Sequence, residues 1–517
     1  MLAGCGSGKF SAKPGGGRDK TTFRYAMETA PTTLDPAKVQ DIATIDLLSN
    51  VFEGLVSYNA KNEIVGQIAE SWVPSEGGRI WTFTIRKNAK FHNGRQVTAD
   101  DVKWSFERAC GAHFNSPTAA NYLQDIVGVK DEMAGKAPGI SGIRVIDPSH
   151  VEFTLDKSRA YFLGKLTYCC AFILAKEAAG PDQINDIKGA IGTGPFKFDK
   201  FAPDQQVELA ANKDYYLGAP KVERIVLPIV KESSTRLNLF KQGQLDTLGI
   251  DRKDLKVTQA DPVLGKQLVF QMRPAVFYVG LSMTNYAPFK DRRVRRAFAM
   301  AIDRDRICNK LLEGMPVAHG LTAPGVPGYR EDYKGLPYDP EGAKKLLAEA
   351  GYPGGKGLPP VQFTFKTTAP DSQHVSEGVE SSVRQNIGMT VQLSTMDWTA
   401  FLDARNKGKF ESYFLSWYAD YLDPENFLSL LLTSNSPLNH DGYKNPEFDR
   451  LCELGDTTTD EAKRLKYYQD AEDIAIQDAA RIPIYYQRDA ILISPRVKGL
   501  ESNLFGNLPR RNVYFGD

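Results

Sequence analysis

Alternating apolar and polar residues predict several strands in the first half of the chain. Residues 81–86 alternate strictly, which is typical of a strand buried on one face. The runs 143–146 and 151–155 flank the turn-forming segment 147–150, and together they predict a hairpin. Shorter apolar runs predict further strands at 23–26, 196–198, 206–209 and 224–230.

Helical spacing of apolar residues first appears between Asp41 and Val56, where one face of a helix is predicted. A second helix is predicted to begin at Thr98 and to continue to about Ala109. Thr98 is a good capping residue, and Asp101 follows it three positions later. The acidic first turn also suits the positive end of the helix dipole.

After about Ala275 the pattern shifts towards helices interleaved with strands. Helices are predicted at 292–310, 340–350, 372–387 and 461–478. Strands are predicted at 361–365, 391–393, 412–417 and 482–493. Because strands and helices alternate on both sides of this shift, we expect two α/β lobes. The space between two lobes is the usual place for a small-molecule site.

Length and charge limit the classes of protein to consider. With 517 residues the chain is too long for one compact core. Lys and Arg number 64 and Asp and Glu 63, so the net charge of +1 argues against a nucleic-acid partner. The basic run 292–296 is therefore interpreted as a solvated helix face. No run of 18 or more apolar residues occurs, and no membrane-spanning segment is expected.

The sequence shows no pattern that predicts catalysis or metal binding. The six histidines are scattered without a HExxH motif, and no nucleophile elbow is present. Cysteines 110, 169, 170, 308 and 452 lack metal-site spacing and are interpreted as buried free thiols, with one disulfide as the alternative. We therefore expect no catalytic residue, no metal and no cofactor.

The amino terminus is similar to a bacterial lipoprotein processing site. Small residues precede Cys5, and a polar Gly-rich stretch follows it to Gly17. This pattern predicts a lipidated Cys5 and a flexible tether over residues 1–20. The alternative is a disordered tail with an incidental cysteine, because the charged and apolar parts of a signal peptide are missing.

Several motifs resemble those of the peptide/nickel-type solute-binding proteins of ABC importers, family 5, closest to the oligopeptide/dipeptide branch. In the first half they lie at 34–36, 53–55, 69–72, 81–86, 91–94, 98–102 and 192–196. In the second half they lie at 294–297, 301–304 and 338–347. The resemblance covers nearly the whole chain from about Thr21.

This resemblance implies a two-lobed periplasmic-binding-protein-like fold of type II, cluster C, with two hinge crossings. The first lobe is expected at 21–275 plus 488–517, with an extra subdomain near 61–190. The second lobe is expected at 276–487. A ligand would be trapped between the lobes by hinge closure.

In the segment Ser416 to Pro424, the carboxylate of Asp420 is flanked by three large aromatic residues. A carboxylate in such surroundings is costly without a cation, and no Lys or Arg follows Lys409 closely. A ligand ammonium is one partner; the alternative is an acidic loop residue that pairs with a Lys or caps a helix near Pro424.

The resemblance assigns Asp420 the role of pairing with the α-ammonium of a peptide, with Trp417 and Tyr418 as pocket walls. It also places Tyr122 and Tyr486 at the cleft, although either aromatic residue can instead belong to the core. The rest of a peptide would be bound through its backbone and through hydrated pockets for its side chains.

We therefore expect a monomeric, lipid-anchored, extracytoplasmic receptor that delivers peptides to ABC permease subunits in the membrane. Oligosaccharide, opine or a metal chelate is the alternative cargo within the same family. An extracellular hydrolase is the alternative of a different class, which is disfavoured because no catalytic pattern is present.

Overall fold

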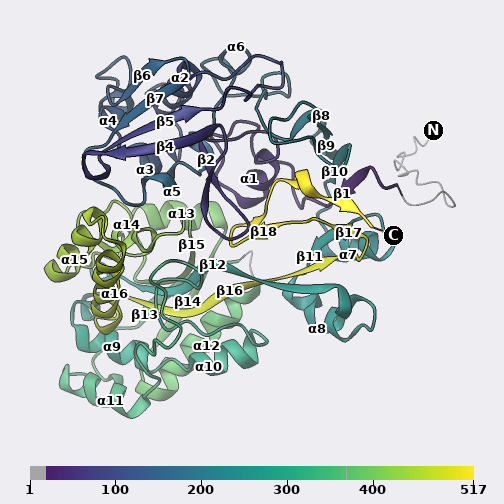
Figure 1. Cartoon of the computed structure of the whole chain (residues 1–517). Helices are drawn as coiled ribbons and strands as arrows, with labels where there is room; N and C mark the ends of the chain where they lie inside the picture. The colour runs from purple at the N-terminus through teal and green to yellow at the C-terminus, as the bar shows by residue number, and fades with distance from the viewer. Residues whose placement is uncertain (1–18, 368–369, 517) are drawn as a thin grey trace, which may run out of the picture.

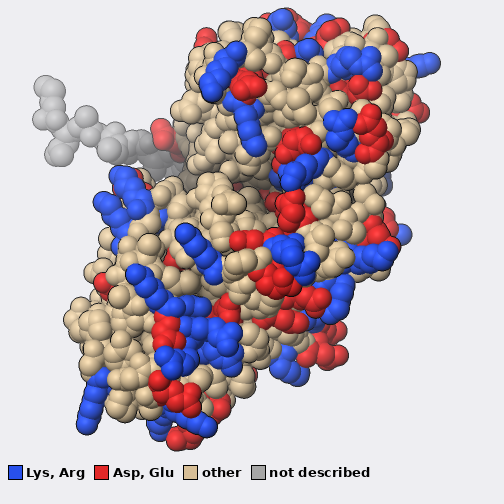
Figure 2. Space-filling view, turned by 90° about the vertical axis from the view of Figure 1, so that its left-hand side faces the viewer, with Lys and Arg blue, Asp and Glu red and all other residues tan. Residues whose placement is uncertain are grey.

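The structure is a computed structural model that describes residues 19–367 and 370–516. Two lobes lie one above the other in Figure 1, with the elements of residues 340–480 in the lower lobe. Figure 2 shows that the surface is notched between them. Both lobes mix helices and strands, which agrees with the predicted α/β class.

The first lobe contains a sheet of strand order β1-β10-β9-β8. Its strands are β1 (Thr22–Arg24), β8 (Phe196–Ala202), β9 (Gln206–Ala211) and β10 (Arg224–Pro228). β1 runs parallel to β10, whereas β9 is antiparallel to both of its neighbours. Alternate residues such as Phe23, Phe196 and Leu209 are fully buried in one apolar cluster, as period-two patterning predicts.

Helix α1 (Ile42–Leu48) is shorter than the predicted helix at 41–56. Asp41 caps its start. At its other end the Ser49 hydroxyl donates to the Ile45 carbonyl at 2.8 Å. The apolar residues after α1 are buried in a loop and in a short strand instead.

A separate sheet of order β4-β5-β7-β6 forms the top of the molecule in Figure 1. Its strands are β4 (Ala69–Ser75), β5 (Ile80–Ile85), β6 (Ile143–Asp147) and β7 (His150–Thr154). The predicted strand at 81–86 and the predicted hairpin are therefore confirmed. Helices α2 (Ala99–Cys110), α3 (Ala119–Leu123), α4 (Val129–Met133), α5 (Phe162–Lys165) and α6 (Lys176–Ala179) accompany this sheet.

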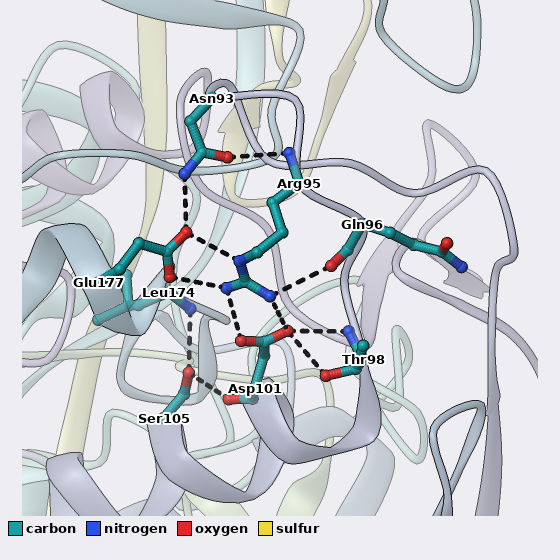
Figure 3. Close-up of polar contacts among 8 residues, drawn as sticks. All are labelled: Asn93, Arg95, Gln96, Thr98, Asp101, Ser105, Leu174 and Glu177. Carbon is teal, nitrogen blue, oxygen red and sulfur yellow. Dashed lines mark hydrogen bonds and ion pairs between the residues drawn. The ribbon is translucent and has the colours of Figure 1, made fainter.

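The polar network in Figure 3 fixes the start of α2. The N–H and the hydroxyl of Thr98 donate to the Asp101 carboxylate at 2.9 and 3.0 Å. Arg95 bonds the same carboxylate at 2.7 Å and reaches Glu177 at 2.8 Å. The capping motif therefore also ties α2 to a segment more than 70 residues along the chain.

Two other motif residues of the first lobe have structural partners. The Glu53 carboxylate accepts hydrogen bonds from the hydroxyls of Tyr215 at 2.6 Å and Thr193 at 2.8 Å. The His92 ring bonds the Gly194 carbonyl at 3.0 Å, and burial lowers the pKa of this histidine to about 4. His92 is therefore neutral at pH 7 and holds this turn in place.

A six-stranded sheet of order β11-β16-β12-β15-β13-β14 extends from the second lobe into the first, where its first strand β11 (Thr247–Gly249) lies. Its other strands are β12 (Leu268–Leu281), β13 (Val361–Lys366), β14 (Val391–Met396), β15 (Ser412–Tyr418) and β16 (Arg481–Ile493). The larger helices of the second lobe are α9 (Arg292–Met300), α11 (Pro340–Glu349), α12 (Pro370–Ile387), α13 (Trp398–Asn406), α15 (Pro446–Thr457) and α16 (Glu461–Gln477). β12 is antiparallel to β15 and β16, whereas β13 is parallel to both of its neighbours.

The single helix predicted at 292–310 is wrong, because the chain breaks into shorter pieces there. α9 ends at Met300, and a new helical start, α10 (Arg304–Arg306), leads into a π-helical turn. Asp303 has a non-helical ψ of 85°, and its carboxylate accepts the Arg306 N–H at 2.8 Å. A residue that caps a following helix interrupts the preceding one.

Two long antiparallel strands, β12 and β16, run between the lobes in Figure 1. Their register is irregular between Met272 and Val276, opposite Arg488 and Tyr486. An irregularity of this kind weakens the ladder locally and lets the paired strands bend.

Candidate functional site

Asp420 follows β15 on a loop between the lobes. Its carboxylate is partly buried, and its backbone N–H donates to the Asn426 side-chain oxygen at 3.2 Å. Burial raises the pKa of Asp420 to about 6, whereas the Tyr122 hydroxyl facing it favours the charged form. Within residues 19–367 and 370–516, no Lys or Arg nitrogen lies within 4.0 Å of this carboxylate. The site therefore offers a desolvated acid without a cation.

Tyr122, a residue of the first lobe, lies against this carboxylate. It is only 5% exposed on the short helix α3, and its ring stacks on that of Tyr168 with centroids 3.9 Å apart. The same ring meets Tyr421 of the second lobe edge-on at 6.4 Å. Residues about 300 positions apart in the sequence therefore lie together around Asp420.

Trp417 and Tyr418 occupy the end of β15, where successive side chains point to opposite faces of the sheet. The Trp417 indole N–H donates to Asn426 at 2.8 Å, next to the backbone of Asp420. Tyr418 packs edge-on against Phe277, with ring centroids 6.1 Å apart. Trp417 therefore lies beside Asp420, whereas Tyr418 packs on Phe277.

Tyr486 belongs to a different set of contacts. Its side chain is 4% exposed, and its hydroxyl bonds both the N–H and the carbonyl of Gly320, at 3.2 and 3.1 Å. Its ring meets Tyr329 edge-on at 5.8 Å. Of the sequence-predicted site residues, Asp420, Trp417 and Tyr122 are brought together, whereas Tyr486 packs inside the second lobe beside the strand irregularity.

The structure adds a second contact between the lobes that the sequence analysis missed. The Leu422 N–H donates to the Tyr58 hydroxyl at 3.0 Å, across 364 positions of sequence. Tyr421 lies along the Tyr161 ring at 6.2 Å, and Gly164 leaves room for it. No local pattern marks these residues as partners, because they meet only in the folded chain.

Charged groups surround this second contact. Lys165 pairs with Asp125 at 2.6 Å on the first-lobe side, and Arg464 pairs with Asp423 at 2.6 Å on the second-lobe side. Glu425 lies between these pairs, and burial raises its pKa to about 8 despite the attraction of Lys165. The segment that follows Asp420 is thus held in place by aromatic and charged neighbours from both lobes.

Other kinds of site are not supported in the described part of the chain. Among residues 19–367 and 370–516, no group of three His, Cys, Asp or Glu side chains is arranged to hold a metal ion. The cysteines described there are free and buried, as expected, at positions 110, 169, 170, 308 and 452. The same ranges contain no helix that is long and apolar enough to cross a membrane. Cys5 lies outside the described residues.

A protein of two α/β lobes, joined by paired strands and contributing groups from both lobes to one polar site, is built as a solute-binding protein. The chain belongs to the bacterial extracellular solute-binding proteins, family 5, whose middle-region model matches residues 63–439. The resemblance seen in the sequence motifs is therefore confirmed.

Known relatives span nearly the whole chain. Periplasmic oligopeptide-binding protein OppA of Salmonella typhimurium is 31% identical over 516 residues, which cover 96% of this chain and 92% of its own. Heme-binding protein A of Haemophilus influenzae is 30% identical and covers 94% of this chain and 90% of its own. The solved structure of the Escherichia coli murein tripeptide binding protein MppA superposes with a TM-score of 0.81 at 27% identity, over 96% of this chain and 99% of that chain. These likenesses confirm the predicted two-lobed, type II fold.

Proposed function

We propose that this protein captures peptides between its two lobes and delivers them to the membrane permease of an ABC importer. The observation that carries the proposal is Asp420, a desolvated carboxylate without a cationic partner among the described residues, which faces Tyr122 of the other lobe. A buried charge calls for a counter-charge, and the α-ammonium of a peptide supplies one. The names of oligopeptide- and murein-tripeptide-binding relatives support the same cargo.

The charge state of Asp420 suits this role. With a pKa of about 6, the carboxylate is roughly 90% ionised at pH 7 in the free protein. An ammonium placed against it forms a charge-assisted hydrogen bond that contributes about 1.5–3 kcal/mol. Because Tyr122 faces the same carboxylate, a ligand bound there also favours the approach of the lobes.

The aromatic residues complete the proposed pocket. Trp417 and Tyr418 provide apolar walls for the first side chains of the peptide, and Tyr122 covers the ammonium from the first lobe. The peptide backbone would pair with protein backbone, and water would fill the space around variable side chains. This mode binds many sequences with similar affinity.

We place the first lobe at 21–275 plus 488–517, with its extra subdomain near 61–190, and the second lobe at 276–487. The supporting observation is the irregular pairing of β12 and β16 between Met272 and Val276, because bending there would open and close the lobes. Tyr486 lies beside this irregularity, so its proposed contribution is to the hinge side of the cleft.

We also propose that Cys5 is lipidated and that the protein works as a monomer tethered to the outer face of a membrane. The small residues before Cys5 and the Gly-rich stretch after it support this location at the membrane. Intact mass spectrometry of protein from bacterial membranes tests it: acyl chains on Cys5 are expected, and an unmodified Cys5 would refute the anchor. Enzymatic activity is not proposed.

Other cargoes fit the unpaired acid less well. An oligosaccharide leaves Asp420 without a counter-charge, and heme carries carboxylates and no ammonium. Opines and metal chelates are the other alternative cargoes within the family.

Native mass spectrometry of the purified protein tests the proposed cargo. Peptides are expected to co-purify with the wild type and to be lost from Asp420→Asn. The exposed carboxylate Asp403 provides a matched control, since Asp403→Asn also removes one negative charge but should retain the peptides. Recovery of sugars or heme in place of peptides would overturn the proposal.

A further inference from the structure

A short hairpin near the end of the chain lies between the two lobes. Its strands are β18 (Ser502–Asn503) and β19 (Gly506–Asn507), and Leu504 and Phe505 form its two-residue tip. In Figure 1, β18 lies at the boundary between the upper and the lower lobe. A two-stranded hairpin is only marginally stable alone, so contacts outside it must hold it in place.

The tip of the hairpin is attached to the first lobe. The Leu504 N–H donates to the Asn62 side-chain oxygen at 2.9 Å, across 442 positions of sequence. The Phe505 ring packs on the Tyr58 ring, with centroids 5.2 Å apart. Tyr58 ends β2 (Val56–Tyr58), and Asn62 lies in the turn that follows. Two neighbouring residues of the first lobe therefore hold the two residues of the tip.

The strands of the hairpin contact β12 where its pairing with β16 is irregular. The Gln271 side chain donates to the Asn503 carbonyl. Gly506 has a positive φ of 130°, and a Cβ added there would lie 2.8 Å from Nη1 of Arg273. Glycine therefore lets the hairpin backbone lie against this guanidinium. Gln271 and Arg273 flank Met272, where the irregular stretch begins, so the hairpin is attached to the strand that is proposed to bend.

The hairpin and its partner Tyr58 also reach the second lobe. Gly325 has a positive φ of 84°, and a Cβ added there would overlap Cδ1 of Leu504. The Tyr58 hydroxyl accepts the Leu422 N–H at 3.0 Å, two residues beyond Asp420. Opening of the lobes would separate Leu504 from Gly325 and Tyr58 from Leu422. Both contacts therefore form on closure.

Two side chains connect the hairpin to the loop that carries Asp420. Phe505 packs on the ring of Tyr58, and the hydroxyl of that ring holds the Leu422 N–H. A tyrosine hydroxyl keeps a fixed position only while its ring is held by packing. The place of Leu422, and with it the loop of Asp420, depends on Phe505.

We propose that Phe505 is a positioning residue for peptide binding, which acts through Tyr58 on the loop of Asp420. When the lobes close, the hairpin tip packs on Gly325, and Phe505 holds the Tyr58 hydroxyl where it accepts the Leu422 N–H. The loop is then fixed with its carboxylate at the ammonium site. This inference rests on the proposed pairing of Asp420 with a peptide ammonium.

Calorimetry of a peptide and of its N-acetylated form tests this role in the full chain. The ratio of the two affinities reports how well Asp420 meets the ammonium, whereas a general loss of stability or closure weakens both peptides alike. Phe505→Ala should reduce this ratio about three- to tenfold. Phe515→Ala is the matched control, because Phe515 belongs to the same C-terminal segment but packs on Arg496, and it should leave the ratio unchanged.

The wild type separates this inference from the proposed function. Equal binding of both peptides by the wild type would refute the ammonium pairing, and the positioning role with it. Discrimination by the wild type that is fully retained in Phe505→Ala would refute the positioning role alone.

A conservative variant provides a second test. Tyr58→Phe keeps the ring packing and removes the hydroxyl, so it should reduce the ratio about as much as Phe505→Ala does. The double variant should lose no more than the larger single loss, because the two residues act in series. Additive losses, or an unchanged ratio in Tyr58→Phe, would overturn the proposal.

Discussion

Replacing Asp420 by Asn should stabilise the ligand-free protein while it abolishes peptide binding. Burial raises the pKa of this carboxyl from 3.8 to about 6, so the folded state resists its ionisation. This rise in the pKa corresponds to roughly 3 kcal/mol of unfolding free energy at pH 7. Asn has nearly the same shape and carries no charge, and a gain of about 1–3 kcal/mol is therefore expected.

The sign of the pH dependence makes this prediction specific. The pKa of Asp420 is higher in the folded state than in the unfolded state. Ionisation of this group therefore lowers the free energy of unfolding of the wild type as the pH rises from about 4 to about 6. The gain from Asp420→Asn should thus be small at pH 4, grow up to about pH 6 and stay constant above it.

Urea unfolding of both proteins, refolded after removal of bound peptide, measures this difference. Other buried acids, such as Glu425 with its pKa of about 8, are common to both proteins and cancel in the comparison. An equal stability at pH 7, or a gain that does not change with pH, would refute the reasoning that Asp420 is a strained, unpaired charge.

Three further results are expected. Peptide affinity should fall about tenfold per pH unit below pH 6 as Asp420 becomes protonated, measured by calorimetry; a flat profile would contradict the ammonium pairing. Arg108→Met should lower the free energy of unfolding in urea by about 3–5 kcal/mol, because it leaves the fully buried Asp35 carboxylate, 2.5 Å from Arg108 Nη2, without its partner. A loss under 1 kcal/mol would contradict this. Gly164→Ala should weaken peptide binding about tenfold, since the added Cβ would lie 3.1 Å from Tyr421 of the other lobe; unchanged affinity would show that this contact does not assist closure.

The sequence predicted those features whose causes are local. Alternation placed β5 and the hairpin, and the spacing of Thr98 and Asp101 placed the start of α2. The predicted helix at 292–310 failed for an equally local reason, the cap at Asp303. Apolar periodicity continues through this cap, so periodicity alone could not reveal the break.

The long-range part of the site could not be predicted from local patterns. The bond from Leu422 to Tyr58 spans 364 positions, and nothing near either residue specifies the other. The stacking of Tyr122 on Tyr168 likewise depends on how the first lobe folds. Asp420 could be singled out because an acid flanked by three large aromatic residues is unusual within one short segment, but its surroundings could be known only from the fold.

The central claim is that Asp420 recognises a peptide ammonium, and one calorimetric comparison tests it most directly. The affinities of a peptide and of its N-acetylated form are measured with the wild type and with Asp420→Asn. Acetylation should cost the wild type about 10- to 150-fold, the equivalent of 1.5–3 kcal/mol, and should cost Asp420→Asn little. Equal binding of both peptides by the wild type would contradict the account.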